Sequence, residues 1–265
     1  MVEVSILMAT RNGEKHIREA IESLLNQTFS DFELIVCNDH STDNTVEIIT
    51  DIMKSDSRVK LFHNTRKAGL TTTLNVGLEK CRGKYVARMD DDDISHFDRI
   101  EKEYSFMEAN KNIAVVGANI NYFDQDGIYG TSNSKINPDK IDIWKGKIFV
   151  HPTVMIRMDV IDKIGKYDES DSVIRIEDYD YWCKLYSMGF QGANLQEILL
   201  DYREDNNAFK KRNNSRRIRL VKRMQYWVKP MKIRGTVKLR MLYEILKCLV
   251  PQKAIQIYHR IRYKK

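Results

Sequence analysis

The 265-residue sequence contains little that could crosslink it or carry it through a membrane. Its four cysteines, Cys37, Cys81, Cys183 and Cys248, are widely separated and include no CxxC pair. This spacing argues against a zinc site or a disulfide framework, and we expect reduced thiols in a cytosolic protein. The start at Met1 lacks the basic and apolar regions of a signal peptide, and no run of about 18 apolar residues occurs. The sequence therefore predicts a chain without a membrane-spanning segment.

The glycine-rich loops that bind nucleotides in two large enzyme classes are also missing. After a predicted strand at residues 4–8 the sequence continues as ATRNG, residues 9–13. This segment lacks the GxGxxG pattern of dinucleotide oxidoreductases and the glycine-rich basic loop of many nucleotidyltransferases. The first class is thereby excluded. A nucleotidyltransferase stays open as an alternative, because such enzymes also place acids and Mg²⁺ at strand ends.

Hydrophobic residues form 42% of the chain, which is enough for a sizeable core that folds alone. Apolar runs of strand length alternate with segments of helical periodicity, an order typical of a mostly parallel sheet flanked by helices. We expect an α/β domain over residues 1–209 and a helical tail over residues 210–265. The expected strands lie at 4–8, 32–37, 59–62, 85–89, 113–123, 153–157 and 198–202, and the longer helices at 14–27, 46–53, 70–81, 98–110 and 177–188.

These two parts carry opposite charge. Residues 210–265 contain 19 Lys or Arg and a single acid, Glu244, so the tail carries a charge of +18. The whole chain has 44 basic and 37 acidic residues, which leaves 25 and 36 for residues 1–209 and a charge of −11 there. A tail with this charge is attracted to polyanions, whereas residues 1–209 are expected to have a different function.

Apolar residues recur at helical spacing within this basic tail. Basic amphipathic helices bind in the interface of anionic membranes, so we expect a cytoplasmic protein that is peripheral at the inner face of the cell membrane, and no nucleic-acid partner. The alternative is that the apolar stripes pack on the main domain while the charges face water. The stripes consist of Leu239, Leu242, Tyr243, Leu246, Leu249 and Val250, and of Ile255, Tyr258 and Ile261.

Four consecutive aspartates, residues 90–93, follow the apolar run at 85–89. A strand that ends in clustered carboxylates offers hard oxygen ligands where a divalent cation and a phosphate can meet. One of these acids could instead cap a helix near Ser95, but a cap needs only one acid. Another acid, Asp39, ends the strand at 32–37, although alone it would also suit a turn. Since neighbouring parallel strands end at one edge, we expect Asp39 and residues 90–92 to converge on one nucleotide site.

Taken together, these motifs resemble the family 2 glycosyltransferases of GT-A fold, in particular the bacterial enzymes that build exopolysaccharide, capsule and O-antigen. The similar segments follow the family's order over roughly residues 1–205, and the basic tail lies outside them. The resemblance implies a nucleotide-sugar donor, a saccharide or lipid-linked acceptor, and Mn²⁺ or Mg²⁺ as cofactor. The segments are VSILMATRN (4–12), residues 23–27, NDHSTDNT (38–45), Asn75 with Gly77, GKYVARMDDDDI (83–94), His151-Pro152 and EDYDYW (177–182).

The resemblance also implies which residues bind the donor. Thr10 and Asp39 would hold the nucleotide base, and Asp90 would lie at the ribose or phosphates. Asp92, the last acid of the DxD pattern, would bind the metal ion. A cation is needed there because the nucleoside diphosphate leaves with two negative charges.

Three more residues belong to this predicted nucleotide site, and two of them depart from the family pattern. Arg11 stands where relatives often have an aromatic residue that stacks on the base, although a planar guanidinium can stack as well. Asn12 follows it in the same segment. Asp91 replaces the usual small middle residue of DxD, and its charge could lie outside the metal shell.

Asp178 matches the catalytic base of the family, in the Glu-Asp motif at the start of the predicted helix 177–188. It would take a proton from an acceptor hydroxyl as that oxygen attacks the anomeric carbon from the face opposite the diphosphate, which inverts the configuration. An acidic pair in a first helical turn is also favourable without any catalytic role. Further candidates for acceptor or phosphate contacts, with core or solvent-facing positions as the alternatives, are Glu177, His151, Trp182, Arg203 and Lys210.

The sequence thus predicts a metal-dependent, inverting glycosyltransferase in surface polysaccharide biosynthesis. Its donor would be a nucleotide sugar, with UDP the favoured nucleotide, and its acceptor a glycan or a lipid-linked saccharide. Besides the nucleotidyltransferase, a non-catalytic protein that docks on membranes or partners through its basic helices is an alternative. The presence of Asp39, Asp90, Asp92 and Asp178 speaks against an inactive site.

Overall fold

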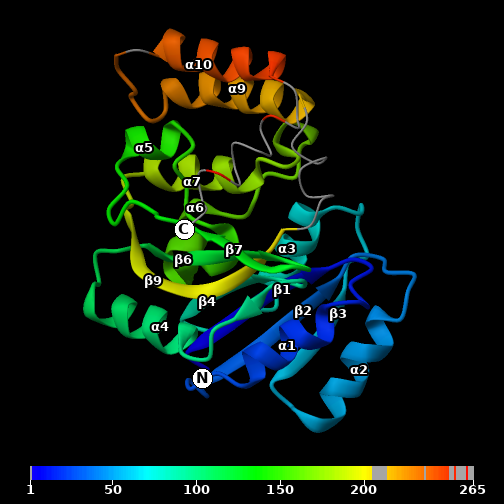
Figure 1. Cartoon of the computed structure of the whole chain (residues 1–265). Helices are drawn as coiled ribbons and strands as arrows, with labels where there is room; N and C mark the ends of the chain where they lie inside the picture. The colour runs from blue at the N-terminus through cyan, green and yellow to red at the C-terminus, as the bar shows by residue number, and fades with distance from the viewer. Residues whose placement is uncertain (1, 205–213, 236, 251–253, 255–260, 262–265) are drawn as a thin grey trace.

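The computed structural model describes residues 2–204, 214–235, 237–250, 254 and 261. Within these residues nine strands form one sheet in the order β3-β2-β1-β4-β8-β6-β9-β5, and β7 pairs with β6. Helices cover both faces of the sheet, and two more form an outer layer (Figure 1). The strands are β1 (Val4–Thr10), β2 (Phe32–Asn38), β3 (Val59–His63), β4 (Tyr85–Asp90), β5 (Ile94–Ser95), β6 (Val115–Asp124), β7 (Gly127–Thr131), β8 (Met155–Arg157) and β9 (Gly192–Arg203). The helices are α1 (Ile17–Leu25), α2 (Thr45–Ser55), α3 (Leu70–Leu78), α4 (Arg99–Ala109), α5 (Lys140–Trp144), α6 (Met158–Ile164), α7 (Glu177–Ser187), α9 (Asn214–Val228) and α10 (Val237–Leu246), with 3₁₀ turns η1 (His151–Thr153), η2 (Asp171–Val173) and η3 (Lys247–Leu249).

The first half of the chain builds the parallel part of the sheet. β1 runs parallel to β2 and β4, and β2 runs parallel to β3. β1, β2 and β4 are buried almost throughout, which explains why the sequence shows continuous apolar runs at these strands. α1 buries one face, which consists of Ile17, Ala20, Ile21 and Leu24, whereas α3 is buried on all sides from residue 72 to residue 78. The strands and helices predicted over residues 4–89 are all present.

The second half of the sheet is mixed. β8 is antiparallel to both β4 and β6, and β5 is antiparallel to β9. β6 and β9 run parallel to each other, and β7 returns along β6 after a turn at Gly127, whose φ is 107°. Six of the nine described strands therefore share one direction. This confirms the predicted α/β class with a mostly parallel sheet flanked by helices.

Three details differ from the predicted elements. β9 begins at Gly192 rather than near residue 198, and its early part is small and polar, so it lacks an apolar signal. Gly192 lies so close to β6 that a Cβ would stand 2.5 Å from a side-chain atom of Val115. Thr153, predicted as the first residue of a strand, ends the 3₁₀ turn η1, and β8 begins at Met155. α5 was not predicted, because five residues are too few to show helical periodicity; an Asp139 capping box starts it.

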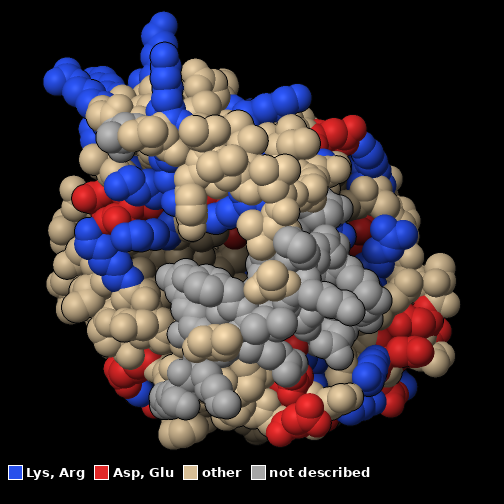
Figure 2. Space-filling view, turned by 45° about the horizontal axis from the view of Figure 1, so that its top comes forward, with Lys and Arg blue, Asp and Glu red and all other residues tan. Residues whose placement is uncertain are grey.

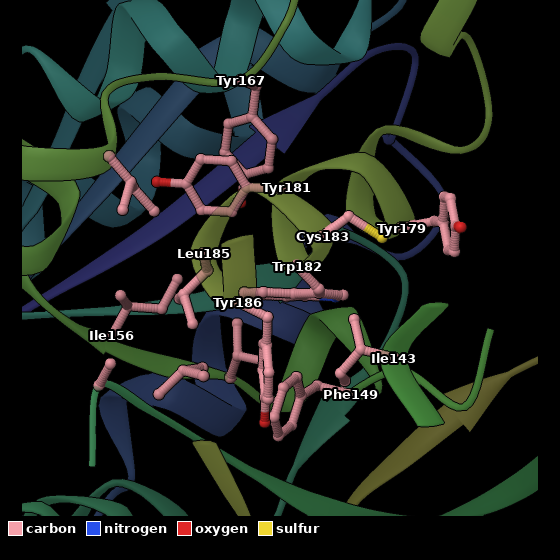
Figure 3. Close-up of a cluster of buried hydrophobic side chains, with 14 of the residues drawn as sticks. Ile143, Phe149, Ile156, Tyr167, Tyr179, Tyr181, Trp182, Cys183, Leu185 and Tyr186 are labelled. Carbon is pink, nitrogen blue, oxygen red and sulfur yellow. The ribbon is translucent and has the colours of Figure 1, made fainter. Parts of the chain in front are cut away.

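Two buried clusters of apolar side chains lie on opposite faces of the sheet. One is formed with α1, α2 and α4, and includes Ile21, Ile49 and Ile100. The other is formed with α3, α6 and α7 and is rich in aromatic rings around Trp182 (Figure 3). The sheet is thus covered on both faces, as a largely parallel sheet requires.

The basic C-terminal helices differ from each other in how they meet the body. α9 packs on α7, and Met224, Trp227, Met231 and Ile233 join the aromatic cluster. α10 lies outside α9 (Figure 1), and the stripe predicted over residues 239–250 is exposed. Ile255 and Tyr258 of the second stripe, and the predicted domain boundary at residue 209, fall outside the described residues. No helix in the described part of the chain has the length and apolar content to cross a membrane.

Candidate active site

Strand register brings the ends of β1, β2 and β4 to one edge of the sheet. Ala9 of β1 pairs with Asp90 of β4, and Thr10 pairs with Asn38 of β2. Asp39 follows directly, and its backbone N–H donates to the carbonyl oxygen of Thr10 at 2.8 Å. The predicted strand-end residues therefore lie at the carboxyl edge of the parallel strands, where α/β proteins bind nucleotides.

Asp91 turns back toward the end of β1. Thr10 donates a hydrogen bond from Oγ1 to Oδ2 of Asp91 at 2.5 Å. Gly13 permits this approach, because a Cβ there would stand 2.6 Å from Oδ2 of Asp91 and 2.7 Å from Oγ1 of Thr10. Burial raises the pKa of Asp91 to about 6, and the charge of Asp90 acts in the same direction. Asp91, the middle acid of the DxD pattern, is thus hydrogen-bonded to the last residue of β1.

Asp39 is buried and oriented by two donors. Its Oδ2 accepts the backbone N–H of Gly69 at 3.0 Å, and its Oδ1 accepts Nδ2 of Asn64 at 3.0 Å. The exposed guanidinium of Arg11 lies on the outer side, with Nη1 3.8 Å from Oδ2 of Asp39. A carboxylate has about four acceptor positions, so Asp39 keeps capacity for a ligand.

Asn12 joins the loop after β1 to the loop after β2. Its backbone N–H donates to Oγ of Ser41 at 2.9 Å, and its Oδ1 accepts the backbone N–H of Thr42 at 2.8 Å. The residue has a φ of 55°, a left-handed conformation that asparagine tolerates better than most residues. Asn12 therefore fixes the shape of the predicted nucleotide site.

Asp90, Asp92 and Asp93 form an acidic cluster in which one carboxylate oxygen of each lies within 4.8 Å of the others. Asp93 is fully buried; its Oδ1 accepts the backbone N–H of Arg203 at 2.9 Å, and its Oδ2 has no hydrogen-bond partner within the described residues. Burial and the charges of Asp90 and Asp92 raise the pKa of Asp93 well above its usual value. Three oxygen donors and an unsatisfied buried oxygen fit a hard divalent cation.

Arg88 is the buried cation of this site. It lies in β4, its Nη2 donates to Oδ1 of Asp90, and its Nε and Nη1 have no hydrogen-bond partner in the part of the chain that is described. Burial raises the pKa of Asp93, Glu177 and Asp178, and the charge of Arg88 opposes that shift at all three. Arg88 thus reduces repulsion among acids at the end of β4 and at the start of α7.

The first turn of α7 carries Glu177 and Asp178, both half-buried. Burial raises the pKa of Glu177 to about 7, and the charge of Asp178 adds to this. Burial also raises the pKa of Asp178, whereas the charge of Arg216 lowers it. Oδ1 of Asp178 accepts the backbone N–H of Tyr179 at 2.7 Å. A carboxylate with a raised pKa is a stronger proton acceptor, so this pair is suited to proton transfer.

α9 holds α7 in place from the outside. Buried Asp180 accepts hydrogen bonds from Nε1 of Trp227 at 2.7 Å and from Nε of Arg223 at 2.5 Å. The segment that leads into α7 is bound as well, because Nε of Arg216 donates to the carbonyl oxygen of Arg175 at 2.8 Å. The basic tail therefore supports the helix that carries Glu177 and Asp178.

Two predicted acceptor contacts, His151 and Trp182, are buried side chains. Trp182 has no exposed surface and packs edge-on against Phe149, with ring centroids 5.4 Å apart (Figure 3). A side chain without exposed surface does not contact an acceptor. Trp182 is therefore a core residue and not an acceptor contact. Nε2 of His151 lies 2.9 Å from the hydroxyl of Tyr167, and burial lowers the pKa of His151 well below its usual value. The imidazole is therefore neutral.

Arg203 stabilises the acidic turn after β4. Its Nε donates to the carbonyl oxygen of Asp92 at 2.8 Å, and its Nη2 donates to Glu19 at 2.7 Å. Its guanidinium also lies over the ring of Phe123, 4.4 Å from the centroid. Arg203 is thus beside the predicted phosphate site but already bonded to protein groups. Lys210 lies outside the described residues.

Neither the role of Arg88 nor a ligand role for Asp93 was predicted from the sequence. The signal for Arg88 was available, because a cation inside an otherwise apolar strand must be paired when the strand is buried. No sequence feature predicted that Asp93 is buried, because four adjacent acids do not reveal which of them turns inward. Its role depends on the chain's path after β4, where β5 pairs with β9.

Comparison with known proteins agrees with this arrangement. Residues 5–165 match the family model for Glycosyl transferase family 2. The chain is 37% identical over 212 residues to the putative glycosyltransferase EpsE of Bacillus subtilis, over 80% of this chain and 76% of that one. It is 30% identical over 200 residues to WfaP of Escherichia coli, a UDP-Glc:alpha-D-GlcNAc-diphosphoundecaprenol beta-1,3-glucosyltransferase, over 76% of each chain.

Solved structures show the same fold. TarS from S. aureus, solved in complex with UDP-GlcNAc, superimposes with a TM-score of 0.70 at 19% identity, over 93% of this chain and 72% of that chain. The mannosyltransferase PcManGT from Pyrobaculum calidifontis, solved with GDP-Man and Mn²⁺, gives a TM-score of 0.65 at 16% identity, over 97% and 79% of the two chains.

The sheet and its covering helices have the GT-A fold of these two structures. The chain belongs to glycosyl transferase family 2. This confirms the family and the fold that the sequence motifs indicated.

Proposed function

We propose that this glycosyltransferase is metal-dependent and inverting. In this proposal it transfers a sugar from a nucleotide sugar, with UDP the favoured nucleotide, to a glycan or lipid-linked saccharide in surface polysaccharide biosynthesis. The observation that carries the proposal is the buried guanidinium of Arg88, which donates to Asp90 of β4 and whose charge also acts on Glu177 and Asp178 of α7. The acids at the end of β4 suit a diphosphate with its cation, and the acids of α7 suit a reacting hydroxyl. The two substrates would therefore meet within one site.

The donor would bind at the loops after β1 and β2. The exposed guanidinium of Arg11 can stack on a base, and the Asp39 carboxylate suits an imide N–H or a ribose hydroxyl. Thr10 and Asp91 would line the same part of the donor site, and Asn12 would hold the loops after β1 and β2 together. Uridine is favoured because TarS was solved with UDP-GlcNAc and WfaP is named for UDP-Glc.

Asp90, Asp92 and Asp93 would hold Mn²⁺ or Mg²⁺. Oδ2 of Asp93, which has no hydrogen-bond partner among the residues that the structure describes, supports this assignment, because a buried carboxylate oxygen is costly unless it gains a ligand. When bound, the cation would neutralise negative charge on the leaving diphosphate. The structure of PcManGT was solved with Mn²⁺, which makes this ion the first to test.

Asp178 is the proposed catalytic base. Its carboxylate would take the proton of the acceptor hydroxyl as the hydroxyl oxygen forms a bond to the anomeric carbon. The bond from that carbon to the diphosphate oxygen breaks on the opposite face, so the configuration inverts. Burial raises the pKa of Asp178, which favours its uptake of a proton.

The acceptor is proposed to be a saccharide on a lipid carrier. The name of WfaP specifies a diphosphoundecaprenol acceptor, and the positive charge of the C-terminal helices would favour such a substrate at an anionic membrane. The protein would then work in the cytoplasm, at the inner face of the cell membrane.

An assay with UDP-Glc, UDP-GlcNAc or GDP-Man, Mn²⁺ and extracted membrane lipid tests this function. We expect nucleoside diphosphate release together with a product of inverted anomeric configuration, seen by NMR. Asp178→Asn should lower kcat about 10²- to 10⁴-fold while UDP binding is retained. Asp171→Asn, at an exposed acid of η2, is the matched control and should keep full activity.

Other products would favour the alternatives. Release of pyrophosphate from a nucleoside triphosphate and a sugar phosphate would indicate a nucleotidyltransferase. Nucleotide binding without turnover of any donor, unchanged in Asp178→Asn, would favour a docking protein on a glycosyltransferase scaffold.

A further inference from the structure

α10 and η3 turn large apolar side chains away from the protein. Five of them are 50–79% exposed and recur at i, i+3, i+4, i+7 and i+10, so they form one continuous stripe along the helix. Figure 1 shows α10 as the outermost helix, on the side of α9 that is opposite α7. The α10 stripe consists of Leu239, Leu242, Tyr243, Leu246 and Leu249.

The inner side of α10 combines apolar Val237 and Met241, which pack against the aromatic cluster, with a buried acid. Glu244 is buried there and forms ion pairs with Arg240 at 2.7 Å and with Lys247 at 3.0 Å. Arg240 also donates from Nη2 to the carbonyl oxygen of Lys145 at 2.6 Å. A helix that faces water normally buries its apolar stripe and exposes its charges. This arrangement indicates that the outer side of α10 is not built to face water alone.

The charges around the stripe are of one sign. Glu244 is the only acid between residues 214 and 250, and it is enclosed by its two cationic partners. Several Lys and Arg side chains of the same layer are exposed. In Figure 2 the layer that faces upward is largely tan, with blue side chains projecting from its edge. The exposed cations are Lys222, Lys229, Lys232, Arg234 and Lys238.

We propose that the α10 stripe docks the protein on an anionic lipid surface. Leucine and tyrosine side chains would enter the region between headgroups and acyl chains, while the surrounding lysines contact the headgroup phosphates. This inference deepens the proposed membrane location by naming the face that binds lipid, and it depends on neither the donor site nor the acids of β4 and α7.

A lipid surface suits this face better than a second copy of the chain does. Two stripes packed against each other would bring two cationic rims together without any exposed acid to pair with them. An anionic membrane supplies both an apolar layer for the leucines and negative charge for the rim. It also places α9, and through Trp227 and Asp180 the start of α7, toward the lipid side of the protein.

Flotation of the full chain with lipid vesicles tests the docking. We expect binding to vesicles with about one-third phosphatidylglycerol, weaker binding to pure phosphatidylcholine vesicles, and a decrease as salt is raised. Leu242→Glu with Leu246→Glu should reduce the partition coefficient by at least about 10-fold for each leucine. Ile128→Glu, at a 60% exposed position of β7, is the matched control and should bind as the wild type does.

Folding and activity are measured separately, so that a failure of docking is distinct from a failure of catalysis. The thermal unfolding temperature and the affinity for UDP should be equal in the double variant and the wild type. A Leu242→Trp reporter should show a blue-shifted emission on vesicles that is quenched by brominated lipid.

Three results would overturn the proposal. The first is a wild-type chain that does not float with anionic vesicles. The second is a folded double variant that binds them as well as Ile128→Glu does. The third is a wild-type dimer that ignores vesicles and becomes monomeric in the double variant, which would assign the stripe to a second copy of the chain.

Discussion

Trp227 donates a hydrogen bond from Nε1 to Oδ1 of Asp180 at 2.7 Å, and so fastens the basic tail to the helix that begins with Glu177 and Asp178. The same carboxylate accepts Nε of Arg223. Residues beyond the family-model match therefore form part of the support of the active site. The two helices of the tail differ in their contacts: α9 packs into the core, and α10 exposes large apolar side chains.

Arg223→Met should destabilise the protein. Asp180 is buried, and removal of its ionic partner leaves a charge that is paired only with the indole of Trp227. Breaking such a pair costs about 3 kcal/mol of unfolding free energy, which denaturant titration would measure. Lys163→Met removes one member of an exposed pair with Asp159 and should change the stability by less than about 1 kcal/mol. Equal stabilities of the two variants would contradict a structural role for the α7–α9 contact.

Catalysis should increase as pH rises through neutrality. Burial raises the pKa of Glu177 to about 7, and it raises the pKa of Asp178 as well. Below these pKa values the base already holds its proton and cannot accept another, so kcat/KM falls as the pH is lowered. We expect the pair to titrate with an apparent pKa well above that of a free carboxyl group, measured from the dependence of kcat/KM on pH between about 5 and 9.

The neighbouring acid provides the test of this assignment. Glu177→Gln removes a negative charge beside Asp178, which should lower the apparent pKa and move the rise in activity to lower pH. Glu197→Gln, at an exposed acid, should leave the profile in place. A profile that does not move in Glu177→Gln would show that another group accepts the proton.

The apolar runs and strand-end acids were enough to predict the parallel half of the fold and the edge that carries the site. Buried strands must be apolar throughout, so β1, β2 and β4 are visible in the sequence, and their parallel pairing fixes where Asp39 and Asp90 lie. The first half of β9 has no such signal, because its small and polar residues are selected by close contact with β6.

Side-chain direction could not be predicted from the same patterns. The helical spacing of Trp182 suits both a core and an acceptor position, and only the packing of α7 on Phe149 decides between them. The apolar stripe of α10 could be seen in the sequence as a helical repeat of apolar residues. The repeat alone does not show which side of the helix faces inward. The side that faces the protein carries Val237 and Met241, which pack against the aromatic cluster, and buried Glu244, which pairs with Arg240.

Removal of the metal should abolish transfer if Asp90, Asp92 and Asp93 hold it. We expect Mn²⁺ to raise the unfolding temperature in the presence of UDP, and we expect Asp92→Ala to lose both this shift and the transferase activity. Asp126→Ala, at an exposed acid in the β6–β7 turn, is the control for a change in net charge. Full activity of the wild type in excess EDTA would refute the proposed metal requirement.

Arg88→Met should destabilise the protein by an amount that depends on pH. Without this cation the carboxyl groups of Asp93, Glu177 and Asp178 would ionise less readily, so their already raised pKa values would rise further. A carboxyl group whose pKa is raised by folding weakens the folded state as pH increases through that pKa. The loss should therefore be smaller near pH 5, where the broken bond to Asp90 is the main cost, and reach about 3–5 kcal/mol near pH 8, measured by denaturant titration at both values.

Arg58→Met separates this electrostatic effect from a simple loss of contacts. Arg58 pairs with Asp56 at 2.7 Å, and this bond lowers the pKa of Asp56, which is thus ionised at both pH values. The loss in Arg58→Met should consequently be the same at pH 5 and pH 8. Arg88→Lys retains the charge and should recover most of the stability at pH 8. If Arg88→Met loses equal stability at both pH values, the buried guanidinium acts only through packing and its bond to Asp90, and its proposed effect on Asp93, Glu177 and Asp178 is wrong.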